Sequence, residues 1–242
     1  MQPLSLWQVF RSNTLNMKKS LVLILLVFSI SALLAQQTET RSVGTFSGIK
    51  SAEGVDVYLK KGDKESVKVE VTGTDPSNVI TEISGSYLKV HMKDGRYRTV
   101  DAKVYVTYVQ LNKLSASSAG SIFSEGPLKA NDMEISASSA GTVEVSIEAS
   151  SVAVSASSAG DVELKGKAKS ISVDASSAGE IDAYDLQVEQ VEADASSGGE
   201  VKINVSRTLT AHASSGGSIR YRGNPDKSIT NSSSGGSVKK SN

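Results

Sequence analysis

The chain has 242 residues, of which 38% are hydrophobic but only 5% aromatic, and it carries 20 glycines, 4 prolines and no cysteine. This length suffices for one domain, but the large side chains that fill an ordinary globular core are scarce. Because disulfides are excluded, stability must come from backbone pairing and burial. The 26 basic residues equal the 26 acidic ones, so no overall charge attracts a polyanion.

The first 35 residues have the pattern of a secretory signal peptide. Met17 is followed by two lysines, by the apolar run Leu21 to Leu34, and then by Ala35 and polar residues. A basic start, an apolar centre and a small exit residue are typical of export signals. We expect translation to start at Met17, residues 1–16 to be an upstream extension, and cleavage to follow Ala35.

Cleavage there removes Arg11, Lys18 and Lys19 and no acidic residue, which leaves 23 basic against 26 acidic residues. A mildly acidic product does not fit nucleic-acid binding. The apolar run is also shorter than a typical membrane span, so we expect no transmembrane segment in the mature chain. The predicted destination is the periplasm, the outer-membrane surface or the extracellular space.

Residues 36–110 alternate apolar and polar positions in short runs. Examples are Val55, Val57 and Leu59, and the turn-forming stretch Lys60 to Lys64 separates such runs. Alternation of this kind predicts strands. We expect these less regular strands to cover the first open edge of the structure that follows.

Residues 111–242 repeat the motif Ala-Ser-Ser-Ala-Gly, or Ala-Ser-Ser-Gly-Gly, about every 19 residues. A fixed period with one or two residues of drift is typical of stacked units that contact mainly their neighbours. A tight corner needs a positive φ or a missing Cβ, which explains the recurring glycine. The predicted corners are Gly120, Gly141, Gly160, Gly179, Gly199, Gly217 and Gly236.

Each repeat alternates on both sides of its corner. Val152, Val154 and Ala156 share one parity, and Val162 and Leu164 continue it after Gly160. We therefore predict an all-β fold, a parallel β-solenoid of about seven 19-residue coils with two or three short strands each, continuous with residues 36–110 as one domain. By the same parity, we expect the second serine of each motif to point inward, in a structural and non-catalytic role.

Three stretches carry a resemblance to a known family. They are VGTFSGIKSAEGVDVYLKKG (Val43 to Gly62), GSYLKVHMKDG (Gly85 to Gly95) and AKVYVTYVQLNKLSASSAGSI (Ala102 to Ile122). Together they resemble the bacterial head GIN domain family, described as putative auto-transporter adhesins, from about Arg41 to the C-terminus. The resemblance implies a β-helix-like fold and an exported or envelope-associated protein of Bacteroidetes-type bacteria. It carries over no catalytic residue.

Carboxylates gather on the outward face of the middle coils, chiefly Asp161, Glu180, Asp182 and Glu200. Like charges at this spacing repel unless a cation shares the face, and Lys165, Lys167 and Lys169 are near enough in sequence to supply one. Several oxygens could alternatively hold Ca²⁺. Since the calcium-binding Gly-Gly-x-Gly-x-Asp repeat is absent, a solvated acidic face is the favoured interpretation, and no cofactor is expected.

Two classes of function remain open. A rigid rod with repeated surface groups suits an adhesin-like binding or structural envelope protein, whose partner would be a surface glycan, a protein or another copy joined through the last coil near Gly236. The alternative is a carbohydrate-active enzyme of the pectinase or lyase kind, with acid and base drawn from pairs such as Asp161 and Glu180. The repetitive setting of these carboxylates favours the non-catalytic interpretation.

Overall fold

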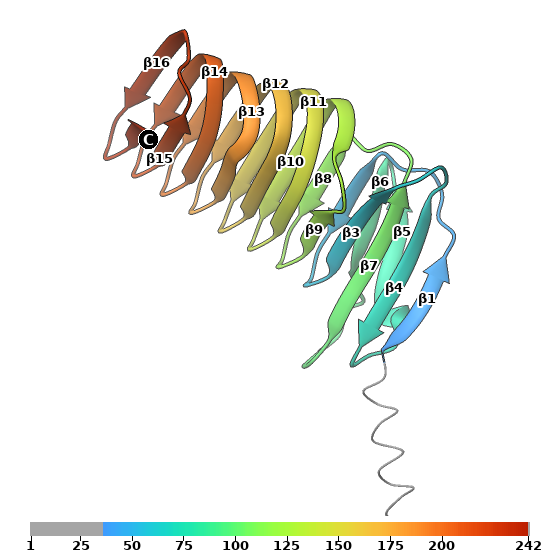
Figure 1. Cartoon of the computed structure of the whole chain (residues 1–242). Coiled ribbons are helices and arrows are strands. Elements are labelled where there is room, and N and C mark those ends of the chain that lie inside the picture. Colours follow the sequence, from blue (N-terminus) through green and yellow to red (C-terminus); the bar gives the residue numbers. More distant parts are fainter. Residues whose placement is uncertain (1–35, 242) are drawn as a thin grey trace, which may run out of the picture.

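The computed structural model describes residues 36–241, so the predicted signal peptide and its start at Met17 lie outside the described residues. The described chain is built of strands and one short 3-10 helix, η1 (Pro76–Asn78), which confirms the all-β prediction (Figure 1). The strands are β1 (Gln37–Arg41), β2 (Gly48–Ser51), β3 (Asp56–Lys61), β4 (Ser66–Thr72), β5 (Val79–Ser84), β6 (Tyr87–Met92), β7 (Asp101–Tyr108), β8 (Lys113–Ala116), β9 (Ser121–Ser124), β10 (Leu128–Ser138), β11 (Thr142–Ser157), β12 (Asp161–Ala175), β13 (Glu180–Ala195), β14 (Glu200–Ala213), β15 (Ser218–Arg222), β16 (Lys227–Ser232) and β17 (Ser237–Lys240).

The repeat forms the predicted parallel solenoid, in which each coil pairs in register with the next. The expectation of two or three short strands per coil was wrong for the central coils. Each of β11 to β14 is one strand of 14 to 16 residues that bends in the middle and supplies both arms of its coil. In β11 the bend lies near Ala149, where inward positions change from odd to even, from Ile147 to Val152. The chain can thus change direction while the hydrogen-bonded ladder continues.

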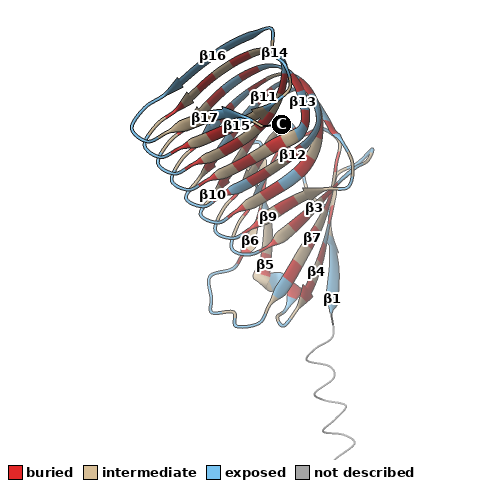
Figure 2. Ribbon diagram, turned by 60° about the vertical axis from the view of Figure 1, so that its left-hand side comes forward, coloured by how far each residue is buried: buried red, intermediate tan, exposed pale blue. Residues whose placement is uncertain are grey.

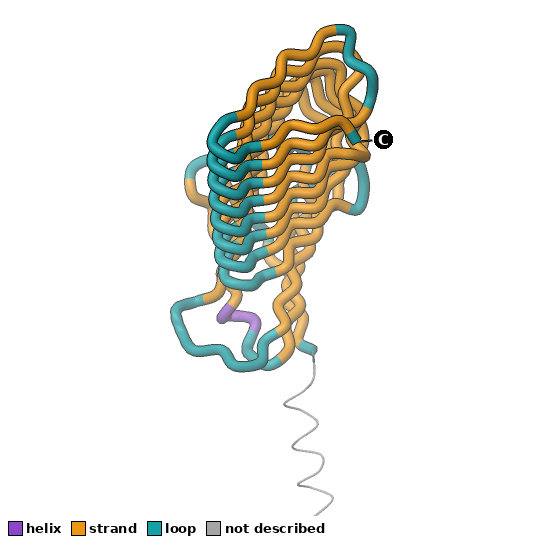
Figure 3. Tube along the Cα trace, turned by 90° about the vertical axis from the view of Figure 1, so that its left-hand side faces the viewer, coloured by secondary structure: helices purple, strands orange, loops and turns teal. Residues whose placement is uncertain are grey.

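The corners form a single row along one edge of the solenoid (Figure 3). Each is a tight turn with two positive φ values, 51° at Ser158 and 59° at Ala159, closed by a hydrogen bond from the Gly160 amide to the Ser157 carbonyl at 2.9 Å. Two such residues define a type I′ turn. Gly160 itself is needed for space, because a Cβ there would lie within 3.0 Å of the Ala137 carbonyl.

The second serine of the motif does not point inward, which corrects our prediction. Ser158 is exposed at the tip of its turn, whereas Ala156 and Gly160 on either side are buried. The period-two rule fails there because a positive φ reverses the direction of the side chain. Successive turns are joined instead by backbone hydrogen bonds, such as that from the Ala159 amide to the Ser177 carbonyl at 3.2 Å.

The core is a set of apolar columns between the two arms. One column, predicted from the period, is at most 4% exposed at every member, and Figure 2 shows the alternating bands of buried residues. Its members are Met133, Val152, Ile171, Val191 and Leu209. Each such side chain contributes roughly 1.5–3 kcal/mol through burial, which replaces the aromatic core that this composition lacks.

The N-terminal strands cover the first end of the solenoid, as predicted, but in a non-sequential order. Strands β2 and β3 form a coil between the β6/β7 layer and the β8/β9 layer. Beyond β6 and β7, β5 and β4 add an antiparallel layer, and β1 then pairs with β4 as the edge strand. The ladder therefore runs without interruption past residue 110 into the repeats.

Candidate functional site

An elongated groove runs along the edge opposite the corners, where each long strand bends. Its volume is about 720 Å³. Four small or medium apolar side chains in one register line it, and three of them are alanines. They are Ala130, Ala149, Ala168 and Val188. Because alanine leaves room that a larger side chain would fill, this column creates the hollow across several coils.

The groove carries alternating charges on one side. The Glu148 carboxylate lies 3.0 Å from the amino group of Lys129 and 3.9 Å from that of Lys167, on the preceding and following coils. The Lys129 contact, with the charge of Lys167, holds the pKa of Glu148 below its usual value. The two lysine side chains remain 60% and 70% exposed, so they can still bind a ligand while Glu148 stays ionised.

The groove continues toward the N-terminal strands through a second hollow of about 410 Å³ that shares Lys129 and Ala130 with the first. Lys61, Asn112 and Asp132 line this extension. Sequence reasoning missed both hollows. Their signal was a second alanine column at the 19-residue period, which follows a charged residue in three successive coils.

The carboxylates predicted to form an acidic face do lie together. Asp161, Glu180 and Glu200 are direct neighbours on adjacent strands. The ammonium group of Lys202 lies 2.6 Å from Glu180, 3.5 Å from Asp182 and 3.8 Å from Glu200, and Arg220 also bonds to Glu200. Three of the four candidate calcium ligands therefore already share a protein cation.

The lysines expected to neutralise this face divide between two surfaces. Lys165 does so, at 2.6 Å from Glu163, but Lys167 and Lys169 line the groove at the other edge. Within residues 36–241, no three His, Cys, Asp or Glu side chains are arranged to hold a metal ion. Calcium binding here, and catalysis by Asp161 with Glu180, remain predictions from the sequence.

Asp161 is the exception within the acidic face, because no cation lies within ion-pair distance of it among the described residues. Burial, reinforced by the charges of Glu180, Glu144 and Glu163, raises the pKa of its carboxyl group. Raised acidity constants can mark functional sites, but they also arise in structural charge clusters. Here the physical cause is a row of like charges on adjacent strands.

Aromatic side chains form a ladder on the outer surface of the first coils, which the sequence did not suggest. The ring of Tyr58 stacks on Tyr105 at 5.3 Å and on Phe123 at 5.2 Å between centroids. These residues are direct partners across β7, β3 and β9. Because the rings cover one another, they join the N-terminal strands to the solenoid. Tyr184, considered as a sugar-stacking residue, is covered by the guanidinium of Arg222 at 3.9 Å.

The fold and the groove together define a non-globular class of protein, a β-solenoid that offers an extended surface rather than a closed active-site cavity. Residues 45–225 match the family described as "Putative auto-transporter adhesin, head GIN domain", and the chain belongs to this family. The resemblance seen in the sequence is thereby confirmed. None of the curated proteins matches the chain. Residues 36–241 contain no helix long and apolar enough to cross a membrane.

Three crystal structures share the fold. A putative adhesin from Bacteroides fragilis NCTC 9343 is 19% identical with a TM-score of 0.74, and the match covers 86% of this chain and 97% of that one. A putative adhesin from Parabacteroides merdae ATCC 43184 is 18% identical with a TM-score of 0.67, covering 86% and 96%. A protein described as a putative lipid binding protein, from Parabacteroides distasonis ATCC 8503, is 22% identical with a TM-score of 0.61, covering 86% and 97%.

Proposed function

We propose that the protein is an exported, non-catalytic, adhesin-like binding protein that holds an extended surface glycan in the groove along its bent edge. The observation that carries this proposal is the direction of the groove, which crosses successive coils from Lys129 to Gln187 and so follows the solenoid axis. A polymer lying in it would meet the same kind of contact at each coil. Several weak contacts that repeat in this way give avidity without any single strong site.

The chemistry of the groove suits a carbohydrate. Its alanine floor can cover the apolar faces of sugar rings, while Lys167, Glu148, Gln187 and Asn204 offer hydrogen-bond donors and acceptors for hydroxyl groups. Sites for small molecules commonly combine an apolar lining with a few placed polar groups. A protein partner would use the same surface, and the experiment below separates the two.

A glycan array tests this proposal with the mature chain, residues 36–242. We expect binding to an extended glycan class, and Ala149→Phe, which fills the floor of the groove, should weaken it at least tenfold. Ser158→Ala lies on the corner edge and should leave binding unchanged. Absence of glycan binding, or equal loss in both variants, would reject the groove as a glycan site, and capture of a protein ligand sensitive to Ala149→Phe would replace the glycan by a protein.

The same array with and without calcium tests the acidic face. Binding that needs calcium and is lost in Asp182→Asn would assign a metal to the face around Glu180 and Glu200. Calcium-independent binding leaves Lys202 as the cation of that face, which is the outcome we expect from its three carboxylate contacts.

Export is tested by the mass of the secreted product. Because β1 begins at Gln37, directly after the predicted cleavage site, removal of residues 1–35 would leave the whole ordered sheet intact. We expect the protein recovered from the cell envelope or medium to begin at Gln36. A full-length protein starting at Met1 and remaining in the cytoplasm would contradict export.

A further inference from the structure

The arm that follows each corner carries a column of charged residues, here called the charge stripe. It consists of Glu144, Glu163, Asp182, Lys202, Arg220 and Lys239, which are direct partners on successive strands from β11 to β17. Three acids are thus followed by three bases along the solenoid axis. Such segregation is unusual for a solvated face, where mixed signs serve solubility equally well.

The two ends of the stripe are the parts left for an external partner. Lys202, near the middle, is used internally by Glu180 and Asp182. Among the described residues, neither Glu144 nor Lys239 takes part in an ion pair, and both are exposed. Arg220 contacts Glu200 but keeps 46% of its side chain exposed.

We propose that the charge stripe is a self-association surface, on which two copies of this chain pack antiparallel about a two-fold axis near Asp182 and Lys202. Reversing the coil order of one copy sets the acidic end of each stripe against the basic end of the other. A two-fold interface uses the same patch on both subunits, so a patch must be complementary to itself. The sequence of three acids and three bases meets this requirement, whereas a stripe of one sign would repel its copy.

The size of the surface predicts a weak and reversible dimer. Five strand spacings of about 4.8 Å give a length of about 24 Å, and five residues of one arm give a width of about 15 Å. The contact would therefore cover roughly 400 Å² of each copy, below the size of standard stable interfaces. Because exposed charge pairs supply the specificity, association should weaken as salt rises.

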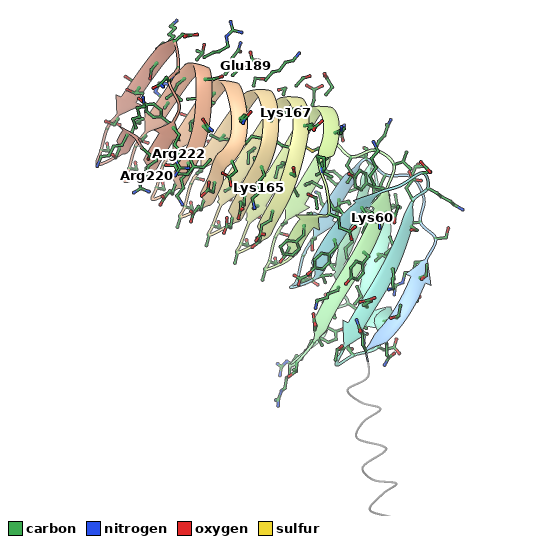
Figure 4. All side chains as sticks on the ribbon, viewed as in Figure 1. Lys60, Lys165, Lys167, Glu189, Arg220 and Arg222 are labelled. Carbon is green, nitrogen blue, oxygen red and sulfur yellow. The ribbon has the colours of Figure 1, made fainter. Side chains whose placement is uncertain are left out.

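The dimer would leave the groove open. In Figure 4, Lys165, Arg220 and Arg222 lie on the strand face, while Lys167 and Glu189 lie along the bent edge. Two copies joined through the strand face would present two grooves to one polymer, which would raise avidity. The self-association itself does not depend on the glycan proposal.

Sedimentation equilibrium of residues 36–242 at low and high salt tests the proposal. We expect a monomer–dimer equilibrium at low salt and mostly monomer at high salt. Glu144→Lys with Glu163→Lys should raise the dissociation constant of the dimer at least about tenfold, as should Arg220→Glu with Lys239→Glu. Combining all four reversals restores a self-complementary stripe and should restore the dimer.

The matched control is Lys167→Glu with Lys169→Glu, which reverses two charges at the bent edge and should leave the dimer unchanged. Circular dichroism and thermal unfolding verify that each variant is folded. A wild-type protein that stays monomeric at low salt up to near-millimolar concentration would overturn the proposal. So would a folded quadruple variant that remains monomeric while the wild type forms dimers, or a control that dissociates like the stripe variants.

Discussion

Two neighbouring positions of each corner accept glycine for different physical reasons. Gly160 has no room for a Cβ, because the Ala137 carbonyl of the preceding coil lies against it. Gly198, in the turn before Gly199, has open space around it but a φ of 75°, and the equivalent position in earlier coils is Ala159 with a φ of 59°. The first position is thus limited by the contact between coils, and the second only by backbone conformation.

Alanine substitutions should separate these two effects. We expect Gly160→Ala to destabilise the protein by about 2 kcal/mol or more, because the coils must move apart at the corner. Gly198→Ala should change the free energy of unfolding by at most about 1 kcal/mol, since strain at positive φ is partly offset by lower entropy of the unfolded chain. Chemical denaturation of both variants measures the difference, and equal losses would contradict this account of the corner.

Asp161 should weaken the fold at neutral pH. Its folded pKa is raised by burial and by neighbouring carboxylates, so the folded state favours the protonated form. Stability from this group is therefore present at acidic pH and is lost as pH rises through the raised pKa. We expect Asp161→Ser, which introduces the residue found at Ser218 in the same column, to raise the melting temperature at pH 7 and to lose that advantage in acid.

Glu200 is the control for this prediction, because it occupies the same column but contacts Lys202 and Arg220. Glu200→Ser should lower the melting temperature slightly at pH 7 rather than raise it, since it removes the partners of two cations. If both substitutions stabilise equally, the effect is relief of total negative charge and not of the local row at Asp161.

At the scale of elements, Arg41 joins the edge strand β1 to the other arm of the N-terminal end. Its guanidinium donates hydrogen bonds to the carbonyls of Pro76 (2.8 Å) and Val79 (2.6 Å) and to the hydroxyl of Thr81 (3.0 Å). Only 18% of the side chain is exposed. One side chain therefore closes the gap between the two arms where no further coil covers them.

Replacing Arg41 by Met should keep most of the apolar stem but leave these carbonyls without a donor. We expect a loss of about 2 kcal/mol in the free energy of unfolding and faster amide exchange in β1 and β5. Glu39→Gln removes only the exposed carboxylate partner of Arg41 at 2.8 Å and should cost far less. Unchanged exchange in the Arg41 variant would show that β1 is held by its pairing with β4 alone.

Sequence periodicity predicted those elements whose neighbours are copies of themselves. The corners and core columns recur because every coil meets the same contact, as at Gly160 and Val152. The first corner escaped notice, because Val55 stands where later coils have glycine, although Glu53 and Gly54 have the same positive φ values. The groove and aromatic ladder also escaped notice, since bend position and register between distant strands decide which of the small and aromatic side chains come together.

At the scale of the whole molecule, the two ends of the solenoid differ in how they stop the stack. Antiparallel strands cover the first end, whereas the last coil has polar residues at inward positions. Ser228, Thr230 and Ser232 stand on Leu209, Ala211 and Ala213 of the preceding coil. A polar terminal repeat keeps a solenoid soluble, and Lys227 and Lys239 add charge to the exposed edge, which discourages pairing with another chain.

This interpretation changes the expectation of self-association through the last coil and makes it testable. Substituting Ser228→Leu, Thr230→Ala and Ser232→Ala extends the apolar columns to the open end, so copies should stack end to end into species larger than a dimer. Light scattering after size-exclusion chromatography measures this. The control places similar apolar side chains on the outward positions of β16, through Lys227→Leu and Asn231→Ala. If the inward variant stays no larger than the wild type, the unpaired backbone edge and its lysines prevent stacking, and the polar columns are not required for it.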